Sequence, residues 1–208
     1  MSEPGISTTQ KIRISIVLSI ALVATVFVVD KAVTYRQQMR YTKAVAEIGG
    51  EFSLLNTDGQ LQDTSQFKGR YRFVYFGFTY CPDMCPLALG TLQKVVRLMK
   101  ERRMDPVAYF VSVDYERDTP AELASYIQHY GGDILAFTAQ NQDQLRQVTS
   151  QYKAFYVKNA KSPEDKYYLI DHSPYIYFLD GDARFLAKFN YTDSPESIVQ
   201  NALILINN

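Results

Sequence analysis

Residues 71–86 read YRFVYFGFTYCPDMCP, and they place the only two cysteines of the 208-residue chain directly after an apolar segment. The run Tyr71–Phe78 is typical of a buried strand. We expect a helix over Pro82–Arg103, because a proline in the first helical turn loses no hydrogen bond that the helix needs. The 3.6-residue helical period would bring Cys81 and Cys85 to one face of its opening turn. The stretch therefore predicts a strand that leads into a helix, with two converging thiols at the junction.

Two converging thiols at the start of a helix are suited to metal binding or to redox chemistry. Unpaired N–H groups and the positive end of the helix dipole favour the thiolate over the thiol. The thiolate is the form that binds soft metals and attacks disulfides. The plain alternatives are two buried apolar cysteines or a small structural disulfide, although a structural disulfide is more useful when it closes a long loop. The spacing therefore favours a copper-like metal site or a redox pair.

From residue 48 onward the chain alternates between strand-like and helix-like segments. Strands separated by helical crossovers must pair in parallel, and a hairpin late in the chain adds antiparallel strands to the same sheet. The pattern predicts an α/β domain over residues 48–208 with an antiparallel end, in which Thr119 and Ser194 are helix N-caps. Besides the segments named above, we expect an N-terminal hairpin at Phe52–Leu55 and Leu61, strands at Val107–Val113, Ile134–Phe137, Phe155–Val157, Tyr175–Leu179 and Phe185–Phe189, and helices at Pro120–Tyr130, Gln142–Tyr152 and Pro195–Ile206.

His172 is expected in a loop between two apolar runs, just before the predicted strand Tyr175–Leu179. A loop residue at the end of a strand can reach the mouth of the sheet, where the first strand delivers the two cysteines. Two thiolates offer Cu(I) two ligands, and a neutral imidazole supplies a third that also suits Cu(II). The candidate metal ligands are therefore Cys81, Cys85 and His172. The other histidine, His129, lies at the end of a predicted helix, where a protonated imidazole is favourable without any ligand role.

Residues 14–29 read ISIVLSIALVATVFVV, sixteen positions without a charge. The run is near the lower length limit of a spanning helix and can be extended if the flanking charged side chains reach the membrane interface. A cleaved signal peptide is the competing interpretation, but no small-residue cleavage site follows the run. We therefore expect a single transmembrane helix over residues 13–33, between an N-terminal tail at 1–12 and a juxtamembrane stalk at 34–47. The positive charges on the two sides of the run do not favour exporting the domain.

The charges of the chain balance, with 22 lysines and arginines against 22 aspartates and glutamates. A balanced chain has no global field that attracts nucleic acid or an acidic substrate. We therefore expect no nucleic-acid partner. No arginine-rich and serine-rich transit segment precedes the apolar run, which favours a bacterial over an organellar protein.

Three segments follow one another in an order that is typical of a known family: Gly77–Pro86, Val111–Pro120 and Asp171–Ser173. Together they resemble the signatures of the Sco/SenC copper-binding assembly proteins, and the resemblance covers nearly the whole predicted domain. Around the cysteines the spacing is CxxxC, whereas common thioredoxins have CxxC. Two positions depart from the family pattern without removing a ligand: Tyr115 stands where many members have proline, and Tyr80 where many have histidine.

The resemblance implies a thioredoxin-like domain in which Cys81, Cys85 and His172 bind copper, as Cu(I) with Cu(II) as the second candidate. It implies a role in assembling the dinuclear copper centre of cytochrome c oxidase subunit II, which would be the partner. It also implies a single-pass protein of the bacterial cytoplasmic (inner) membrane, whose soluble domain faces the periplasm.

Four further residues near these motifs are weaker candidates. Asp114, at the end of a strand, and Asp118, before a helix, can help to dock a partner or tune the site, but Asp118 also fits a simple helix start. Asp83 and Met84 lie between the cysteines. A thioether suits Cu(I), yet a loop residue at this position needs no such role.

Two classes of function stay open. In the first, the protein is a non-enzymatic metallochaperone that holds copper through few ligands and passes it to a partner's cysteines. In the second, it is a membrane-anchored thiol-disulfide oxidoreductase, in which Cys81 and Cys85 are a redox-active pair that cycles through a disulfide bond; His172 then needs no ligand role. The CxxxC pair together with a histidine favours copper. A peroxiredoxin-like enzyme is disfavoured, because the usual threonine context before its cysteine is missing.

Overall fold

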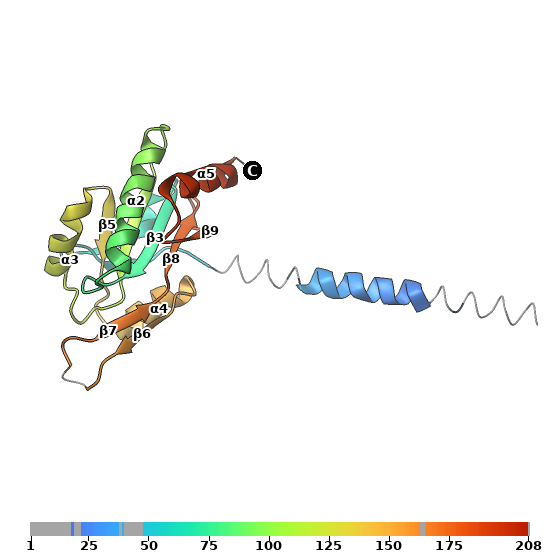
Figure 1. Ribbon diagram of the computed structural model, residues 1–208, viewed down its shortest axis with the longest axis horizontal. Helices are drawn as coiled ribbons and strands as arrows, with labels where there is room; N and C mark the ends of the chain where they lie inside the picture. The colour runs from blue at the N-terminus through green and yellow to red at the C-terminus, as the bar shows by residue number, and fades with distance from the viewer. Residues whose placement is uncertain (1–17, 19–21, 38, 40–47, 163–164, 208) are drawn as a thin grey trace, which may run out of the picture. The chain divides into compact units, whose positions relative to one another are not determined.

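The computed structural model describes residues 18, 22–37, 39, 48–162 and 165–207 (Figure 1). The chain divides into two units, residues 1–46 and residues 47–208. In the first unit, residues 22–37 are helical. Among the described residues, no helix is both long enough and apolar enough to cross a membrane. The predicted tail and parts of the predicted anchor and stalk lie outside the described residues.

The second unit is built on a five-stranded sheet. Its strands are β3 (Arg72–Gly77), β4 (Val107–Ser112), β5 (Ile134–Phe137), β8 (Tyr175–Leu179) and β9 (Phe185–Asn190). Their order across the sheet is β5-β4-β3-β8-β9. The first three run parallel to one another, whereas β8 and β9 continue the sheet antiparallel. This confirms the expected α/β arrangement with an antiparallel end.

Helices connect these strands and cover the sheet. They are α2 (Met84–Lys100), α3 (Pro120–Ile127), α4 (Gln142–Gln151) and α5 (Pro195–Ile206), with the short 3-10 helices η1 (Thr64–Phe67) and η2 (Gln128–Tyr130). α2 and α5 lie side by side (Figure 1). The predicted N-caps are confirmed, because the Thr119 and Ser194 hydroxyls accept hydrogen bonds from backbone N–H groups three residues later, at 3.3 and 3.2 Å.

Two helices differ from the sequence-based prediction. α2 begins at Met84 rather than Pro82, because the chain is still a loop at Cys81 and Pro82, and it ends at Lys100 rather than Arg103. Arg103 adopts a left-handed φ of 62°, which cannot continue a right-handed helix. The predicted helix Pro120–Tyr130 divides into α3 and the tighter η2.

Two hairpins lie outside the main sheet. The predicted N-terminal hairpin is confirmed as β1 (Ser53–Leu55) and β2 (Leu61–Asp63). The second hairpin joins β6 (Tyr156–Asn159) to β7 (Leu169–His172), which pair only with each other (Figure 1). The expectation that His172 lies in a loop is therefore wrong, since it is the last residue of a strand. The sequence did not reveal β7, because its pairing partner is supplied by a segment ten or more positions earlier.

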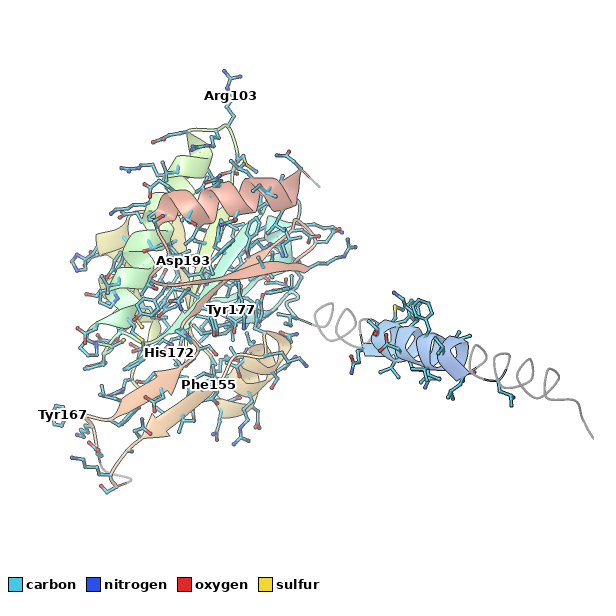
Figure 2. All side chains as sticks on the ribbon, turned by 45° about the vertical axis from the view of Figure 1, so that its right-hand side comes forward. Arg103, Phe155, Tyr167, His172, Tyr177 and Asp193 are labelled. Atoms are coloured by element: carbon cyan, nitrogen blue, oxygen red, sulfur yellow. The ribbon has the colours of Figure 1, made fainter. Side chains whose placement is uncertain are left out.

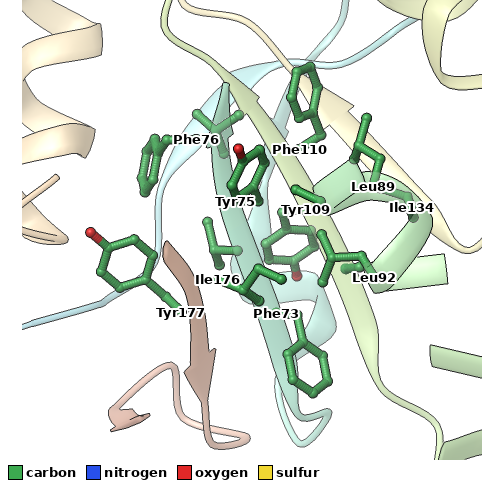
Figure 3. Close-up of a cluster of buried hydrophobic side chains, with 14 of the residues drawn as sticks. Phe73, Tyr75, Phe76, Leu89, Leu92, Tyr109, Phe110, Ile134, Ile176 and Tyr177 are labelled. Atoms are coloured by element: carbon green, nitrogen blue, oxygen red, sulfur yellow. The ribbon is translucent and has the colours of Figure 1, made fainter. Parts of the chain in front are cut away.

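Adjacent residues of β3 point to opposite faces of the sheet, as they do in any strand. Tyr75 and Phe76 are both fully buried. Phe76 packs edge-on against Tyr152 and Tyr177, with ring centroids 5.3 and 5.8 Å away. In Figure 3, Phe76 and Tyr177 lie on one side of the sheet, and Phe110 lies on the other side with side chains of α2. Tyr75 therefore belongs to the face that α2 covers.

Gly77 ends β3 at the point where α2 passes close to the sheet. A Cβ atom there would lie 2.6 Å from Cys85 Sγ and 2.8 Å from the Phe110 ring. Such distances are far inside van der Waals contact, so only glycine lets the helix approach the strand this closely. The residue before the cysteine loop therefore sets how deeply Cys85 is buried.

We expect Gly77→Ala to lower the free energy of unfolding by about 1–3 kcal/mol, because the added methyl group overpacks a filled core. Urea unfolding followed by circular dichroism measures this. Gly90→Ala in α2 is the matched control, since no atom lies within 4 Å of a Cβ at that position. Alanine is favoured over glycine inside a helix by about 0.5–1 kcal/mol, so the control should be slightly stabilised. A Gly77→Ala protein as stable as the original would contradict the packing argument.

Candidate metal centre

The loop between β3 and α2 places Cys81 at the N-terminus of the helix without making it part of the helix. Cys81 Sγ accepts a hydrogen bond from the backbone N–H of Cys85 at 3.4 Å, which is the kind of contact that an N-cap side chain makes. The residue at the N-cap position, Asp83, makes no side-chain capping bond. The sulfur therefore lies where unpaired N–H groups and the helix dipole favour negative charge. The two cysteines converge as expected, although Cys81 precedes the helix.

The β6–β7 hairpin brings His172 to the cysteines, and Figure 2 shows it where the hairpin meets the rest of the domain. Its Nε2 lies 3.6 Å from Cys85 Sγ. Its Nδ1 lies 3.2 Å from the carbonyl oxygen of Ser173. Because a carbonyl only accepts, Nδ1 carries the proton and Nε2 presents a lone pair to the cysteines. The rings of Tyr75 and Phe78 meet the imidazole edge-on and hold its plane.

The three candidate ligands form one compact, buried group. Their ligand atoms all lie within 4.8 Å of one another. The exposed fractions are 6% for Cys81, 0% for Cys85 and 3% for His172. Among the residues that the structure describes, these three are the group of histidine, cysteine and acidic side chains that could hold a metal ion.

Burial and hydrogen bonding give the two thiols different charges. The hydrogen bond with Cys85 lowers the pKa of Cys81 to about 4, and burial opposes this change. Burial raises the pKa of Cys85 above its ordinary value, and the neighbouring Cys81 raises it further. At neutral pH the metal-free pair therefore consists of one thiolate, at Cys81, and one thiol, at Cys85.

Asp118 fixes the loop that carries Cys81. Its carboxylate accepts hydrogen bonds from the backbone N–H and the hydroxyl of Thr79, at 3.0 and 2.6 Å, and from the hydroxyl of Ser112 at 2.6 Å. Burial raises the pKa of Asp118 to about 6, although these donors oppose the shift. Asp118 does not cap the helix, because Thr119 does; its structural role is to hold Thr79, two positions before Cys81.

Asp114 and Arg117 hold the hairpin that carries His172. The Asp114 carboxylate accepts hydrogen bonds from the Tyr168 hydroxyl at 2.6 Å and from Arg117 Nε at 2.5 Å. Arg117 also donates to the Tyr168 carbonyl oxygen at 2.9 Å, and its guanidinium lies 3.5 Å from the centre of the Tyr168 ring and 4.7 Å from that of Tyr80. Sequence reasoning missed Arg117 and Tyr168. Arg117 lies inside a motif used for the resemblance, but only the folded chain shows that it meets the hairpin.

The remaining candidates lie outside the ligand group. Asp83 is not part of it, and Met84 packs against the core as a half-buried side chain. His129 lies exposed in η2 and outside the ligand group, in agreement with the expectation that it has no ligand role.

Two sulfurs and one imidazole nitrogen form a soft donor set. Thiolates select Cu(I) and zinc, and imidazole suits both oxidation states of copper. A structural zinc site is almost always four-coordinate, and the group here has three members. The arrangement therefore suits Cu(I), and it does not supply the four protein ligands of a structural zinc site; a zinc ion with three protein ligands and a water molecule would also fit the donor set. The same Cys81 thiolate is also the form that attacks disulfides.

The reduced, metal-free protein should show a thiolate that persists in mildly acidic solution. We expect its ultraviolet thiolate absorbance to disappear as the pH falls through about 4, where Cys81 takes up a proton. Cys81→Ser should remove this step. Cys85→Ala should move it to higher pH, because the hydrogen bond from the Cys85 side chain, which is the largest cause of the low pKa of Cys81, is lost. A single step near the ordinary thiol pKa of about 8.5 in the unmodified protein would contradict this assignment.

Comparisons of sequence identify relatives along most of the chain. A model of the SCO1/SenC family matches residues 40–206. The SCO2-like protein of Rickettsia felis is 32% identical over 154 residues, which cover 74% of this chain and 75% of that protein. The mitochondrial SCO2 homolog of Bos taurus is 39% identical over 171 residues, which cover 80% of this chain and 63% of that protein.

The fold also agrees with a solved structure of a related protein. The crystal structure of Arabidopsis thaliana ScoI with copper bound matches with a TM-score of 0.70 and 30% identity, covering 77% of this chain and 98% of that one. The match confirms the expected thioredoxin-like α/β fold. Because the family model spans residues 40–206 and relatives reach 32% and 39% identity, this chain belongs to the SCO1/SenC family.

Proposed function

We propose that this protein is a copper chaperone that holds copper through Cys81, Cys85 and His172 and helps to assemble the dinuclear copper centre of cytochrome c oxidase subunit II. The observation that carries the proposal is the convergence of two sulfurs and a lone-pair nitrogen within 4.8 Å. Membership of the SCO1/SenC family supports it, and so does the copper-bound structure of the Arabidopsis relative.

The protonation states of the three candidate ligands favour Cu(I). Cys81 is already a thiolate at neutral pH, and Cys85 releases its proton when a cation takes that place, as thiol ligands do. The Nε2 lone pair of His172 completes a three-coordinate set. Imidazole is the ligand of this set that is best suited to the harder Cu(II) ion, so His172 decides how well the site holds the oxidised metal.

The position of Cys81 suits transfer by ligand exchange. It lies in a loop next to Tyr80, whose side chain is 55% exposed. Thr79 and Tyr80 also line a surface pocket of about 280 Å³. A partner thiolate that approaches over this loop can replace the ligands of the metal one at a time. Copper then moves without any oxidation, reduction or covalent step, so the protein needs no catalytic residue.

The same proposal places the domain outside the bacterial cytoplasmic membrane, facing the periplasm. Residues 13–33 would be the single anchor, with the tail 1–12 in the cytoplasm, the stalk 34–47 next to the membrane and the copper-binding domain over 48–208. The uncharged run at 14–29 supports this arrangement. An exported partner with copper-binding cysteines requires its copper donor on the same side of the membrane.

A thiol-disulfide oxidoreductase is the second candidate, and the low pKa of Cys81 favours it. The Cys81 thiolate would attack a disulfide of the partner, and Cys85 would resolve the mixed disulfide, so that the partner is reduced and this pair is oxidised to a disulfide. Another dithiol would have to reduce the pair again. In this mechanism His172 would serve only as a base for the Cys85 thiol, from which its Nε2 lies 3.6 Å away. Copper binding uses all three side chains as ligands and agrees with the copper-bound relative, so copper is the better conclusion.

The reduced full chain should bind Cu(I) in a one-to-one ratio in competition titrations without oxygen. Cys81→Ser together with Cys85→Ser should abolish binding, because the soft ion loses both thiolates. His172→Ala should weaken Cu(I) binding at least by the roughly 10–100-fold that outer-sphere changes typically cost. It should alter the absorption and spin-resonance spectra of bound Cu(II) more severely.

His129→Ala is the matched control for the histidine, since His129 is exposed and lies outside the ligand group. It should leave both metal ions bound as before. If the double serine variant still bound one Cu(I) ion per chain, the proposed site would be contradicted. If the Cu(II) spectra of His172→Ala were unchanged, His172 would not be a ligand.

A strain that lacks this protein should have low cytochrome c oxidase activity, and added copper should restore part of it, because mass action can replace delivery of a metal. Growth with copper and, separately, with a membrane-permeant thiol reductant compares the two candidate functions. Rescue by the reductant with no response to copper would favour the oxidoreductase and overturn the chaperone.

A further inference from the structure

Tyr75 buries a polar group that the fold does not use. Its side chain is 0% exposed, and its hydroxyl makes no hydrogen bond of normal geometry with the described residues, although it interacts with the Cys85 thiol. Leaving a buried donor unpaired lowers the stability of the folded protein. A phenylalanine would fill the same space in β3 without that cost, and a partner that forms in another state of the protein would give the hydroxyl a use.

Tyr75 lies next to two of the three candidate ligands, His172 and Cys85. The centre of its ring is 5.9 Å from that of the His172 imidazole, at an interplanar angle of 82°. A Cβ placed at Gly77 would lie 2.6 Å from Cys85 Sγ and 3.1 Å from Tyr75 Cε1. Cε1 is the ring carbon next to the one that carries the hydroxyl. The sulfur and the hydroxyl end of the ring therefore border the same small gap, which the missing side chain of Gly77 leaves open.

We propose, on the basis of the copper site proposed above, that Tyr75 is a positioning residue whose hydroxyl donates a hydrogen bond to the Cys85 sulfur when that sulfur binds copper as a thiolate. A neutral thiol is a weak acceptor. A thiolate is a charged acceptor and forms a stronger bond. The partner that the hydroxyl lacks is therefore supplied when the metal binds.

This hydrogen bond would also select between the oxidation states of copper. A thiolate bound to Cu(I) keeps more negative charge than one bound to Cu(II), so the donor stabilises the reduced site more. Hydrogen bonds to a cysteine sulfur tune the potential of copper sites in this way. Because the same ring meets His172 edge-on, Tyr75 also fixes the position of the imidazole relative to the Cys85 sulfur.

The test compares Tyr75→Phe with Tyr109→Phe in the copper-loaded full chain. In Tyr75→Phe, we expect the sulfur-to-Cu(II) absorption band to move to longer wavelength. The affinity for Cu(II) relative to Cu(I) should rise about tenfold, which lowers the reduction potential by about 59 mV for one electron. Tyr109 is the matched control, because it too is 0% exposed with an unpaired hydroxyl, yet it packs against Phe52 and Phe137 away from the ligands.

An unshifted band and potential in copper-loaded Tyr75→Phe would overturn the proposal, and so would an equal shift in Tyr109→Phe. If the unmodified chain took up no copper, the proposed function would fall first and the role of Tyr75 with it. A second measurement needs no variant: with ring-labelled tyrosine, the hydroxyl-bearing carbon of Tyr75 should shift in the carbon magnetic-resonance spectrum on Cu(I) binding, and that of Tyr109 should not. An unmoved Tyr75 signal would count against the hydrogen bond.

Discussion

The Asp118 carboxylate joins the end of β4 to the loop after β3, since it accepts hydrogen bonds from Ser112 and from both the backbone and the side chain of Thr79. It is completely buried, so water cannot replace any of these donors. Each donor left unpaired would cost about 1–3 kcal/mol. The loop therefore has one strongly preferred path, and that path delivers the Cys81 sulfur to the backbone N–H of Cys85.

The neighbouring segment does the same for the third candidate ligand, His172. Asp114 binds Arg117 and the Tyr168 hydroxyl, and Arg117 binds the Tyr168 carbonyl oxygen. Tyr168 directly precedes β7, the strand that ends at His172. The short stretch after β4 thus holds both the cysteine loop and the histidine hairpin. This explains how ligands from segments that never pair in a common sheet meet within 4.8 Å.

The electrostatics of the pair serve metal binding and disulfide exchange equally well, so charge alone does not decide the function. A low pKa at Cys81 supplies a ready ligand or a ready nucleophile. The imidazole favours copper, because a soft metal ion can use both sulfurs and the Nε2 lone pair together, whereas disulfide exchange would need that nitrogen only as a base for Cys85. The unpaired hydroxyl of Tyr75 beside the same sulfur also suits a site whose charge changes when a metal enters.

The sequence by itself determined the strand-to-helix junction with its two thiols, the alternation of strands and helices, and the N-caps at Thr119 and Ser194, because each depends on residues close together in the chain. It also carried the three motifs on which the family resemblance rests. Only the tertiary structure decided that His172 ends a strand, that Asp118 holds Thr79, and that Tyr75 lies against the ligands. Those facts depend on which segments pack together over long separations, and neither spacing nor periodicity records the partner of a buried polar group.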